Sequence, residues 1–289
     1  MPRSEIHPLV SEGRLLTVPG VYDVLSAKIA RRCGFGVVVL SGYAVAATQL
    51  GEPDIGLLTQ TEILDAARRI RSHVDVALVV DGDTGYGGPL NVQRLVIELI
   101  QMGASGVLLE DQRWPKRCGH LEGKDVIDAE EHAAKIRAAV DARADAPLLI
   151  TARTDALAVH GIDEALRRAH MYKEAGADVL FVEGPRTRAE LERIGSDLPG
   201  PLAVNLIEDG VTPMCRLDEL AEMGFFSVGF VLSALFSSAF ALEETYRRIY
   251  SDGATDAMRE RMTCFEGIKD ILGTDERLAL DRRFGPDST

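Results

Sequence analysis

Cysteine and histidine are scarce in this chain, which has four cysteines and six histidines among 289 residues. Cys33, Cys118, Cys215 and Cys264 are widely spaced and form no CxxC pair, so we expect neither a disulfide scaffold nor a zinc site. Such cysteine use suits a reducing cytoplasm. We expect Cys33 and Cys264 to be buried, because a lone cysteine commonly packs as a small apolar side chain.

Basic residues are also in the minority, with 32 Lys and Arg against 45 Asp and Glu and a formal net charge of −13. Without a basic stripe, neither a nucleic acid nor an anionic membrane is an expected partner. A small anionic substrate is compatible with this composition, because local arginines or a divalent cation can attract it. The N-terminal residues MPRSEIHPLV lack an apolar core, so we expect no secretory signal.

Long uncharged runs are nearly absent. One such run is residues 225–242, which contain four serines and a glycine and change in character after Leu232. This pattern predicts a core strand followed by a buried helix rather than a membrane span.

Eight short apolar runs alternate with longer amphipathic segments. The segments repeat apolar residues at helical spacing, and the alternation is typical of βα units around a parallel sheet. The predicted strands lie in residues 15–20, 37–42, 76–83, 106–111, 148–155, 179–184, 202–207 and 227–233.

Eight strands in this order predict an α/β fold, a closed (β/α)8 TIM barrel, rather than an open sheet. We expect a single domain over residues 1–289, with the barrel in residues 15–242 and extra helices in residues 243–289. A hydrophobic content of 46% is sufficient for a large core.

Polar residues stand where the predicted strands end. A TIM barrel carries its chemistry at the carboxyl ends of its strands, so these residues are candidates for one site. Any single one could instead cap a helix or form an ion pair, but their repetition favours a site. They are Asp81, Asp83, Glu110, Asp111, Arg153, Glu183 and Asn205.

Four carboxylates, from Asp54, Asp81, Asp83 and Glu110, are expected to converge at this end of the barrel. Their mutual repulsion would raise some of their pKa values unless a cation neutralised them. Hard oxygen ligands without a histidine cluster indicate Mg²⁺, with Mn²⁺ as the alternative. Because Mg²⁺ keeps several waters, only one or two of the four need touch it.

The segment EDQRWPKRCGH, after the fourth predicted strand, is expected to be a mobile loop. Its Cys118 is flanked by Lys116, Arg117 and His120, and nearby cations favour the thiolate. We therefore expect Cys118 to serve chemistry and Cys215 to be structural.

The motifs DGDTGYGG, PKRCGH and ARTDA resemble the isocitrate lyase/phosphoenolpyruvate mutase superfamily over about residues 18–242. The runs SGYAVAATQLGEPDIGLLT and EDQRWPKRCGH are most similar to the branch of the petal death protein, 2-alkylmalate lyases, methylisocitrate lyases and oxaloacetate hydrolases. The resemblance implies a Mg²⁺-dependent enzyme that cleaves a carbon–carbon bond in a 2-hydroxy dicarboxylate or tricarboxylate. It also implies a homotetramer whose subunits exchange their last helix.

The resemblance assigns roles to residues in these motifs. Asp81 would contact the metal directly, and Asp54, Asp83 and Glu110 would hold its waters. The catalytic candidates, with Cys118 as the acid–base, are Cys118, Lys116, His120, Arg153 and Glu183. The substrate-binding candidates are Ser41, Gly42, Tyr43, Gly119, Arg153, Asn205, Val231 and Ser233.

Three alternatives stay open. Oxaloacetate hydrolysis to oxalate and acetate follows the same scheme if the hydrated ketone supplies the hydroxyl group. A phosphonopyruvate-type mutase or hydrolase is a second alternative, because a similar KRCGH occurs in carboxyphosphonoenolpyruvate mutase. A barrel that only binds is a third, and the presence of the carboxylates and of Cys118 disfavours it.

Val231 bears on the first alternative. Related hydrolases carry a serine, and methylisocitrate lyases a proline, near this place in the eighth strand. A buried gem-diol beside valine would lose a hydrogen bond, at a cost of about 1–3 kcal/mol. Valine therefore disfavours a hydrolase, unless a shift in register gives the role to Ser233.

Overall fold

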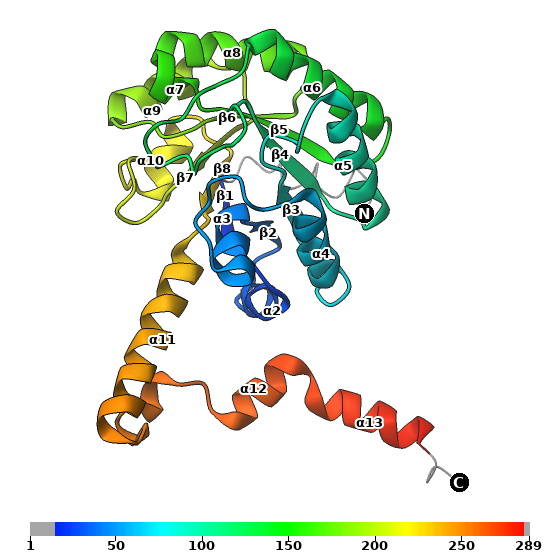
Figure 1. Cartoon of the computed structure of the whole chain (residues 1–289), viewed down its shortest axis with the longest axis vertical. Helices are drawn as coiled ribbons and strands as arrows, with labels where there is room; N and C mark the ends of the chain where they lie inside the picture. The colour runs from blue at the N-terminus through cyan, green and yellow to red at the C-terminus, as the bar shows by residue number, and fades with distance from the viewer. Residues whose placement is uncertain (1–14, 286–289) are drawn as a thin grey trace. The chain divides into compact units, whose positions relative to one another are not determined.

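The computed structural model describes residues 15–285, and these contain eight parallel strands that close into a barrel in chain order (Figure 1). The strands are β1 Leu16–Val21, β2 Val37–Leu40, β3 Ala77–Asp81, β4 Gly106–Glu110, β5 Leu149–Thr154, β6 Val179–Val182, β7 Leu202–Asn205 and β8 Ser227–Phe230. Each of the eight apolar runs coincides with one strand, although β1 extends one residue beyond its run, to Val21. The predicted TIM barrel is confirmed.

Helices follow the strands around the barrel (Figure 1). They are α2 Val24–Arg32, α3 Gly42–Val45, the π-helical turn η1 Ala46–Leu50, α4 Gln60–Arg71, α5 Pro89–Gln101, α6 Ala129–Arg143, α7 Ala156–His160, α8 Ile162–Glu174, α9 Arg188–Asp197 and α10 Leu217–Glu222. After β8 come α11 Ser233–Asp252, the 3-10 helix η2 Asp256–Arg261, α12 Phe265–Leu272 and α13 Thr274–Phe284.

The alternation of side chains along each strand separates the core from the site. On β3, Leu78 and Val80 are fully buried in the core, whereas Val79 and Asp81 line the cavity inside the barrel. Successive side chains of a strand point to opposite faces, so every strand gives one row to the helices and one to the interior. The last interior position of a strand is therefore where a functional side chain emerges.

Glycines follow the ends of several helices, in the MGAS sequence of residues 102–105 and the AGAD sequence of residues 175–178. Gly103 and Gly176 have φ angles of 77° and 104°, a left-handed conformation that glycine adopts without a Cβ clash. The chain thereby leaves each helix and enters the next strand within a few residues.

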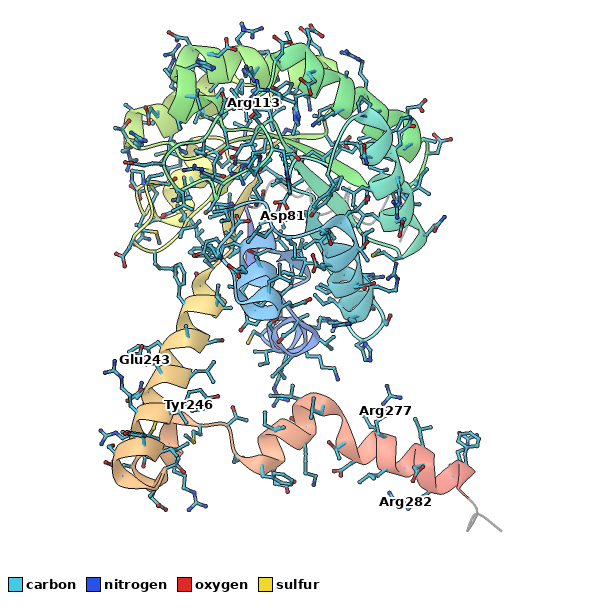
Figure 2. The ribbon with its side chains drawn as sticks, in the orientation of Figure 1. Asp81, Arg113, Glu243, Tyr246, Arg277 and Arg282 are labelled. Carbon is cyan, nitrogen blue, oxygen red and sulfur yellow. The ribbon has the colours of Figure 1, made fainter. Side chains whose placement is uncertain are left out.

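Two compact units make up the chain, and they divide between Ala234 and Leu235. The first unit contains the whole barrel. The second contains most of α11 together with α12 and α13, and none of these three helices has a buried residue. In Figure 2, Glu243 and Tyr246 are labelled on α11.

The expectation of a buried helix after β8 is therefore wrong for the single chain. Phe240 and Tyr246 of α11 are 62% and 63% exposed, and no residue of this helix is buried. Cys33 and Cys264 are also exposed rather than buried: they stand at the ends of α2 and α12, where they cap helices.

No helix in residues 15–285 is both long enough and apolar enough to cross a membrane.

Candidate active site

A strained turn after β3 brings acidic residues together. Asp81 is the last residue of β3, and Asp83 has left-handed backbone with a φ of 47°. The two carboxylate oxygens of Asp81 accept from the amides of Gly42 and Asp83, both at 3.2 Å. The Asp83 carbonyl accepts from the Glu110 amide at 2.9 Å. A non-glycine residue holds such a conformation only where its surroundings enforce it, and here the hydrogen bonds to β4 do so.

Lys116 reaches these carboxylates from the loop after β4. Its ammonium nitrogen lies 2.5 Å from Asp54 Oδ1 and 2.5 Å from Asp83 Oδ1. The Lys116 side chain is only 3% exposed, and a buried ammonium group is stable only with such partners. Lys116 therefore partly neutralises the negative charge of two of the four carboxylates that were predicted to converge.

Burial raises the pKa of Asp83 to about 6, although the Lys116 ammonium opposes the rise. Burial also raises the pKa of Glu110 well above its usual range, against the attraction of Arg153 and Lys116. The predicted rise in pKa is therefore present at these two groups, but burial is its main cause and mutual repulsion contributes less.

The acidic residues suit a hydrated Mg²⁺ ion. Within residues 15–285, no three His, Cys, Asp or Glu side chains are already arranged as a metal cage, but Mg²⁺ keeps several waters and needs only one or two protein ligands. Asp81 lines the cavity. Glu110 Oε1 is buried and has no hydrogen-bond partner among the described residues, so a hydrated cation would satisfy it. Asp81 is labelled in Figure 2.

Arg153 stands beside Glu110, because the two residues pair in the β4–β5 ladder. Its guanidinium lies 3.3 Å from Glu110 Oε2, 2.9 Å from Asp155 Oδ2 and 3.4 Å from Glu183 Oε2. These three acidic partners fix the orientation of the guanidinium plane. Arg153 also lines the cavity. A guanidinium held in this way is suited to bind a carboxylate.

The cysteine loop, residues 111–128, is closed over the cavity. The Cys118 amide donates to the Asp54 carbonyl at 2.9 Å. His120 lies 3.1 Å from Glu183 through Nε2 and accepts from the Val211 amide at 2.9 Å through Nδ1. A Cβ on Gly119 would lie 2.5 Å from both Arg153 and Glu183, so only glycine allows this approach.

The expected thiolate at Cys118 is contradicted. Burial raises the pKa of Cys118 to about 11. Lys116 is directed at Asp54 and Asp83, and Arg117 donates to the Glu122 carbonyl, so neither flanking cation is engaged with the sulfur. The resting residue is a neutral thiol, which can give a proton.

Comparison with known proteins identifies the family. The family model described as phosphoenolpyruvate phosphomutase matches residues 6–250. This chain belongs to the phosphoenolpyruvate phosphomutase family. It is similar to the petal death protein of Dianthus caryophyllus, with 44% identity over 98% of this chain and 89% of that protein. This places it in the isocitrate lyase/phosphoenolpyruvate mutase superfamily, as the motifs predicted.

Other members of the family carry different activities in their names. A chloroplastic carboxyvinyl-carboxyphosphonate phosphorylmutase of Arabidopsis thaliana is 43% identical over 98% of this chain and 84% of its own length. A 2,3-dimethylmalate lyase of Eubacterium barkeri is 37% identical over 97% of both chains. A solved oxaloacetate acetylhydrolase with 3,3-difluorooxalacetate has a TM-score of 0.92 and 32% identity, over 99% of this chain and 98% of that one. The relatives that are named lyases support an enzyme of the carbon–carbon lyase type.

Most of the residues predicted to bind the metal, to bind substrate or to act in catalysis surround one cavity of about 150 Å³. Those that line it are Ser41, Tyr43, Asp54, Asp81, Cys118, Gly119, His120, Arg153, Glu183, Asn205 and Val231. Four other candidates do not line the cavity but contact residues that do. Gly42 and Asp83 contact Asp81, Lys116 contacts Asp54, and Glu110 contacts Arg153. Deeper in the barrel the lining is apolar, with Val39, Val79 and Phe181 among its residues.

Ser233 stands apart from the other candidates. It does not line the cavity, and its hydroxyl donates to Glu208 Oε1 at 2.6 Å. Ser233 is the first residue of α11, whereas Val231 directly follows β8 and lines the cavity. The shift in register that would place Ser233 in the cavity lining is therefore not observed, and Val231 occupies that position.

Two buried residues that the sequence did not single out complete the site. Asp155 contacts Arg153, and Lys124 contacts Asp155 at 2.9 Å. Asp155 ends the ARTD run, so its place after β5 was a usable signal. Lys124 resembles any surface lysine of a loop, and nothing in the sequence marks it.

Proposed function

We propose that this enzyme cleaves the C2–C3 bond of a 2-hydroxy dicarboxylate or tricarboxylate of the 2-alkylmalate or methylisocitrate type. The products are a 2-oxoacid and a second carboxylate. The observation that carries the proposal is that Asp81, Arg153 and Cys118 line one cavity under a closed loop. A cation site, a carboxylate-binding guanidinium and a proton donor are the groups that this cleavage needs.

The proposed metal is Mg²⁺ or Mn²⁺, with Asp81 as the direct ligand and Asp54, Asp83 and Glu110 around its waters. When bound, the ion would supply positive charge beside the substrate's carboxylate and hydroxyl oxygens. The similarity to a solved phosphonopyruvate hydrolase complex with oxalate and Mg²⁺, at 29% identity, supports this choice.

The residues around the cavity have separate roles in the proposed reaction. Arg153 pairs with one substrate carboxylate, while Ser41 and Tyr43 offer hydroxyl groups to the 2-oxoacid part. The C2 hydroxyl releases its proton to the medium and becomes a carbonyl, and the C2–C3 bond breaks with its electron pair left on C3. Cys118 donates a proton to C3 and regains one from the medium, so the proton lost by the hydroxyl is replaced overall.

The closed loop assists these reaction steps. Cys118, Gly119 and His120 line the cavity, and a carbanion beside a carboxylate is strongly basic. Exclusion of water leaves the thiol as the nearest acid and protects the intermediate.

Val231 favours cleavage of an alkyl-substituted substrate over hydrolysis of oxaloacetate. Its side chain lines the cavity and has no hydrogen-bonding group for a gem-diol. We expect Val231→Ser to raise the ratio of kcat/KM for oxaloacetate over that for a 2-alkylmalate about 5- to 150-fold, since one buried hydrogen bond is worth about 1–3 kcal/mol. Ser233→Ala is the matched control and should leave the ratio unchanged. An unchanged ratio in Val231→Ser would reject this role.

The test of the function is a coupled assay for 2-oxoacid release from citramalate, larger 2-alkylmalates, methylisocitrate and oxaloacetate, with and without Mg²⁺. We expect metal-dependent turnover of a 2-hydroxy acid. The similarity to the phosphorylmutase makes phosphonopyruvate the necessary comparison. Turnover of phosphonopyruvate with no turnover of any malate derivative would select phosphorus chemistry instead.

Assembly and location form the rest of the proposal. We propose a homotetramer in the cytoplasm that exchanges its last helix between subunits, and residues 1–289 as one family domain. The apolar side chains exposed on α11 support assembly.

A further inference from the structure

Lys124 is a buried cation within the cysteine loop itself. Its side chain is 3% exposed. The ammonium nitrogen lies 2.5 Å from the Gly119 carbonyl oxygen and 2.9 Å from Asp155 Oδ1. Because a buried ammonium group needs its acceptors, these two contacts hold it at one position between the loop and the end of β5.

Asp155 connects Lys124 to the substrate-binding guanidinium. Its carboxylate is fully buried and accepts from Arg153 twice, at 2.9 Å from Nε and 3.1 Å from Nη2. Burial alone would raise the pKa of Asp155, but Arg153 and Lys124 lower it to about 2. The carboxylate is therefore ionised and shared between the two cations.

Gly119 connects Lys124 to the proton donor. It follows Cys118 and precedes His120, and it lies against Arg153 and Glu183 with no room for a side chain. A hydrogen bond at its carbonyl fixes the peptide between Gly119 and His120, at the tip of the loop.

We propose that Lys124 is a positioning residue that couples closure of the cysteine loop to the orientation of Arg153. When the loop is closed, one ammonium group satisfies both the loop tip and Asp155. When the loop opens, the Gly119 carbonyl moves away from the Lys124 ammonium. Asp155 then loses Lys124 as a partner and keeps only Arg153. A buried carboxylate with an incomplete set of partners is costly, so this arrangement favours the closed loop. The role rests on the proposed function of the site.

A second ion pair in the same loop provides the comparison. Arg113, which is labelled in Figure 2, contacts Asp125 at 2.7 Å, but the two side chains are 59% and 60% exposed. Exposed pairs contribute little to stability. Arg113→Gln is therefore a matched control that removes a cation from the loop without opening it.

The experiment measures alkylation of Cys118 by iodoacetamide in the substrate-free protein, by mass spectrometry of its peptide. We expect Lys124→Met to raise the rate at least tenfold and Arg113→Gln to leave it unchanged. The exposed Cys33 is an internal reference whose rate should not change. Removal of a nearby cation disfavours the thiolate, so a faster reaction reports opening of the loop and not activation of the thiol.

A second measurement tests the link to Arg153. Oxalate, in the presence of Mg²⁺, is expected to bind Lys124→Met about tenfold more weakly than the unaltered protein or Arg113→Gln, by calorimetry. Neither measurement requires turnover, so failure of the lyase assignment would leave this result standing.

An unchanged alkylation rate in a folded Lys124→Met protein would overturn the proposal. If Lys124→Met does not fold, Lys124→Gln replaces it, with the same expected results. Failure of both variants to fold would also overturn the proposal, because Lys124 would then serve folding rather than closure.

Discussion

Cys118 is the residue whose chemistry depends most on its surroundings. The closed loop buries the thiol, and burial raises its pKa to about 11. A thiol is still several pKa units more acidic than a serine hydroxyl. It is thus protonated at neutral pH and yet able to release its proton to a much stronger base.

We therefore expect Cys118→Ser to bind substrate but to lose about 10²–10⁴-fold in kcat, the usual range for loss of a general acid. Steady-state kinetics on the best substrate, with a binding measurement alongside, checks this. Cys215→Ser, a thiol outside the cavity, is the control and should be nearly silent.

Two results would contradict the role of Cys118. One is near-normal kcat in Cys118→Ser, as expected if the side chain only packs the loop. The other is a stable covalent adduct between substrate and Cys118 during turnover, which would make the thiol a nucleophile.

At the scale of elements, the strand ends and the loops after them hold the polar groups of the site. Because the metal carboxylates stand at the end of the barrel and not in its core, we expect chelation to abolish turnover while the protein stays folded. Asp81→Ala should be inactive even with excess Mg²⁺, and Asp65→Asn, an exposed carboxylate on α4, should be normal.

Activity assays with and without chelator, paired with circular dichroism, check this prediction. Full turnover by metal-free protein in excess chelator would remove the metal from the proposed mechanism.

The elements could be predicted because their signals are local. Each strand is a short apolar run, and Asp81 or Arg153 is polar where such a run ends, so the barrel places it at the site. The protonation of Cys118 could not be predicted, because it depends on burial by the folded loop and on where the ammonium of Lys116 is directed. Lys124 was missed for the same reason: its partners, Gly119 and Asp155, are set by tertiary contacts.

At the scale of the whole molecule, the C-terminal unit has little core of its own, since Met258 of η2 is the one buried residue among its described positions. Its helices α11, α12 and α13 have no buried residues, whereas Phe240 and Tyr250 are 62% and 94% exposed. Exposed apolar side chains of this size support the proposed association between copies of the chain.

We expect a tetramer at micromolar concentration in light scattering, with a Tm that rises with protein concentration. Phe240→Glu should shift the protein toward smaller species, while Arg247→Gln, an exposed cation on the same helix, should not. A monomer at micromolar concentration would refute the assembly.

The closure of the barrel has a consequence for synthesis. β1 pairs with β8 as well as with β2, and the ribosome delivers these two partners at opposite ends of the barrel sequence. Until residues 227–230 emerge, β1 keeps an open edge, and an open edge is a template for pairing with other chains. The β1 edge of the nascent chain is therefore open to pairing with other chains through most of translation. Chaperones that shield this edge should increase the yield of folded enzyme.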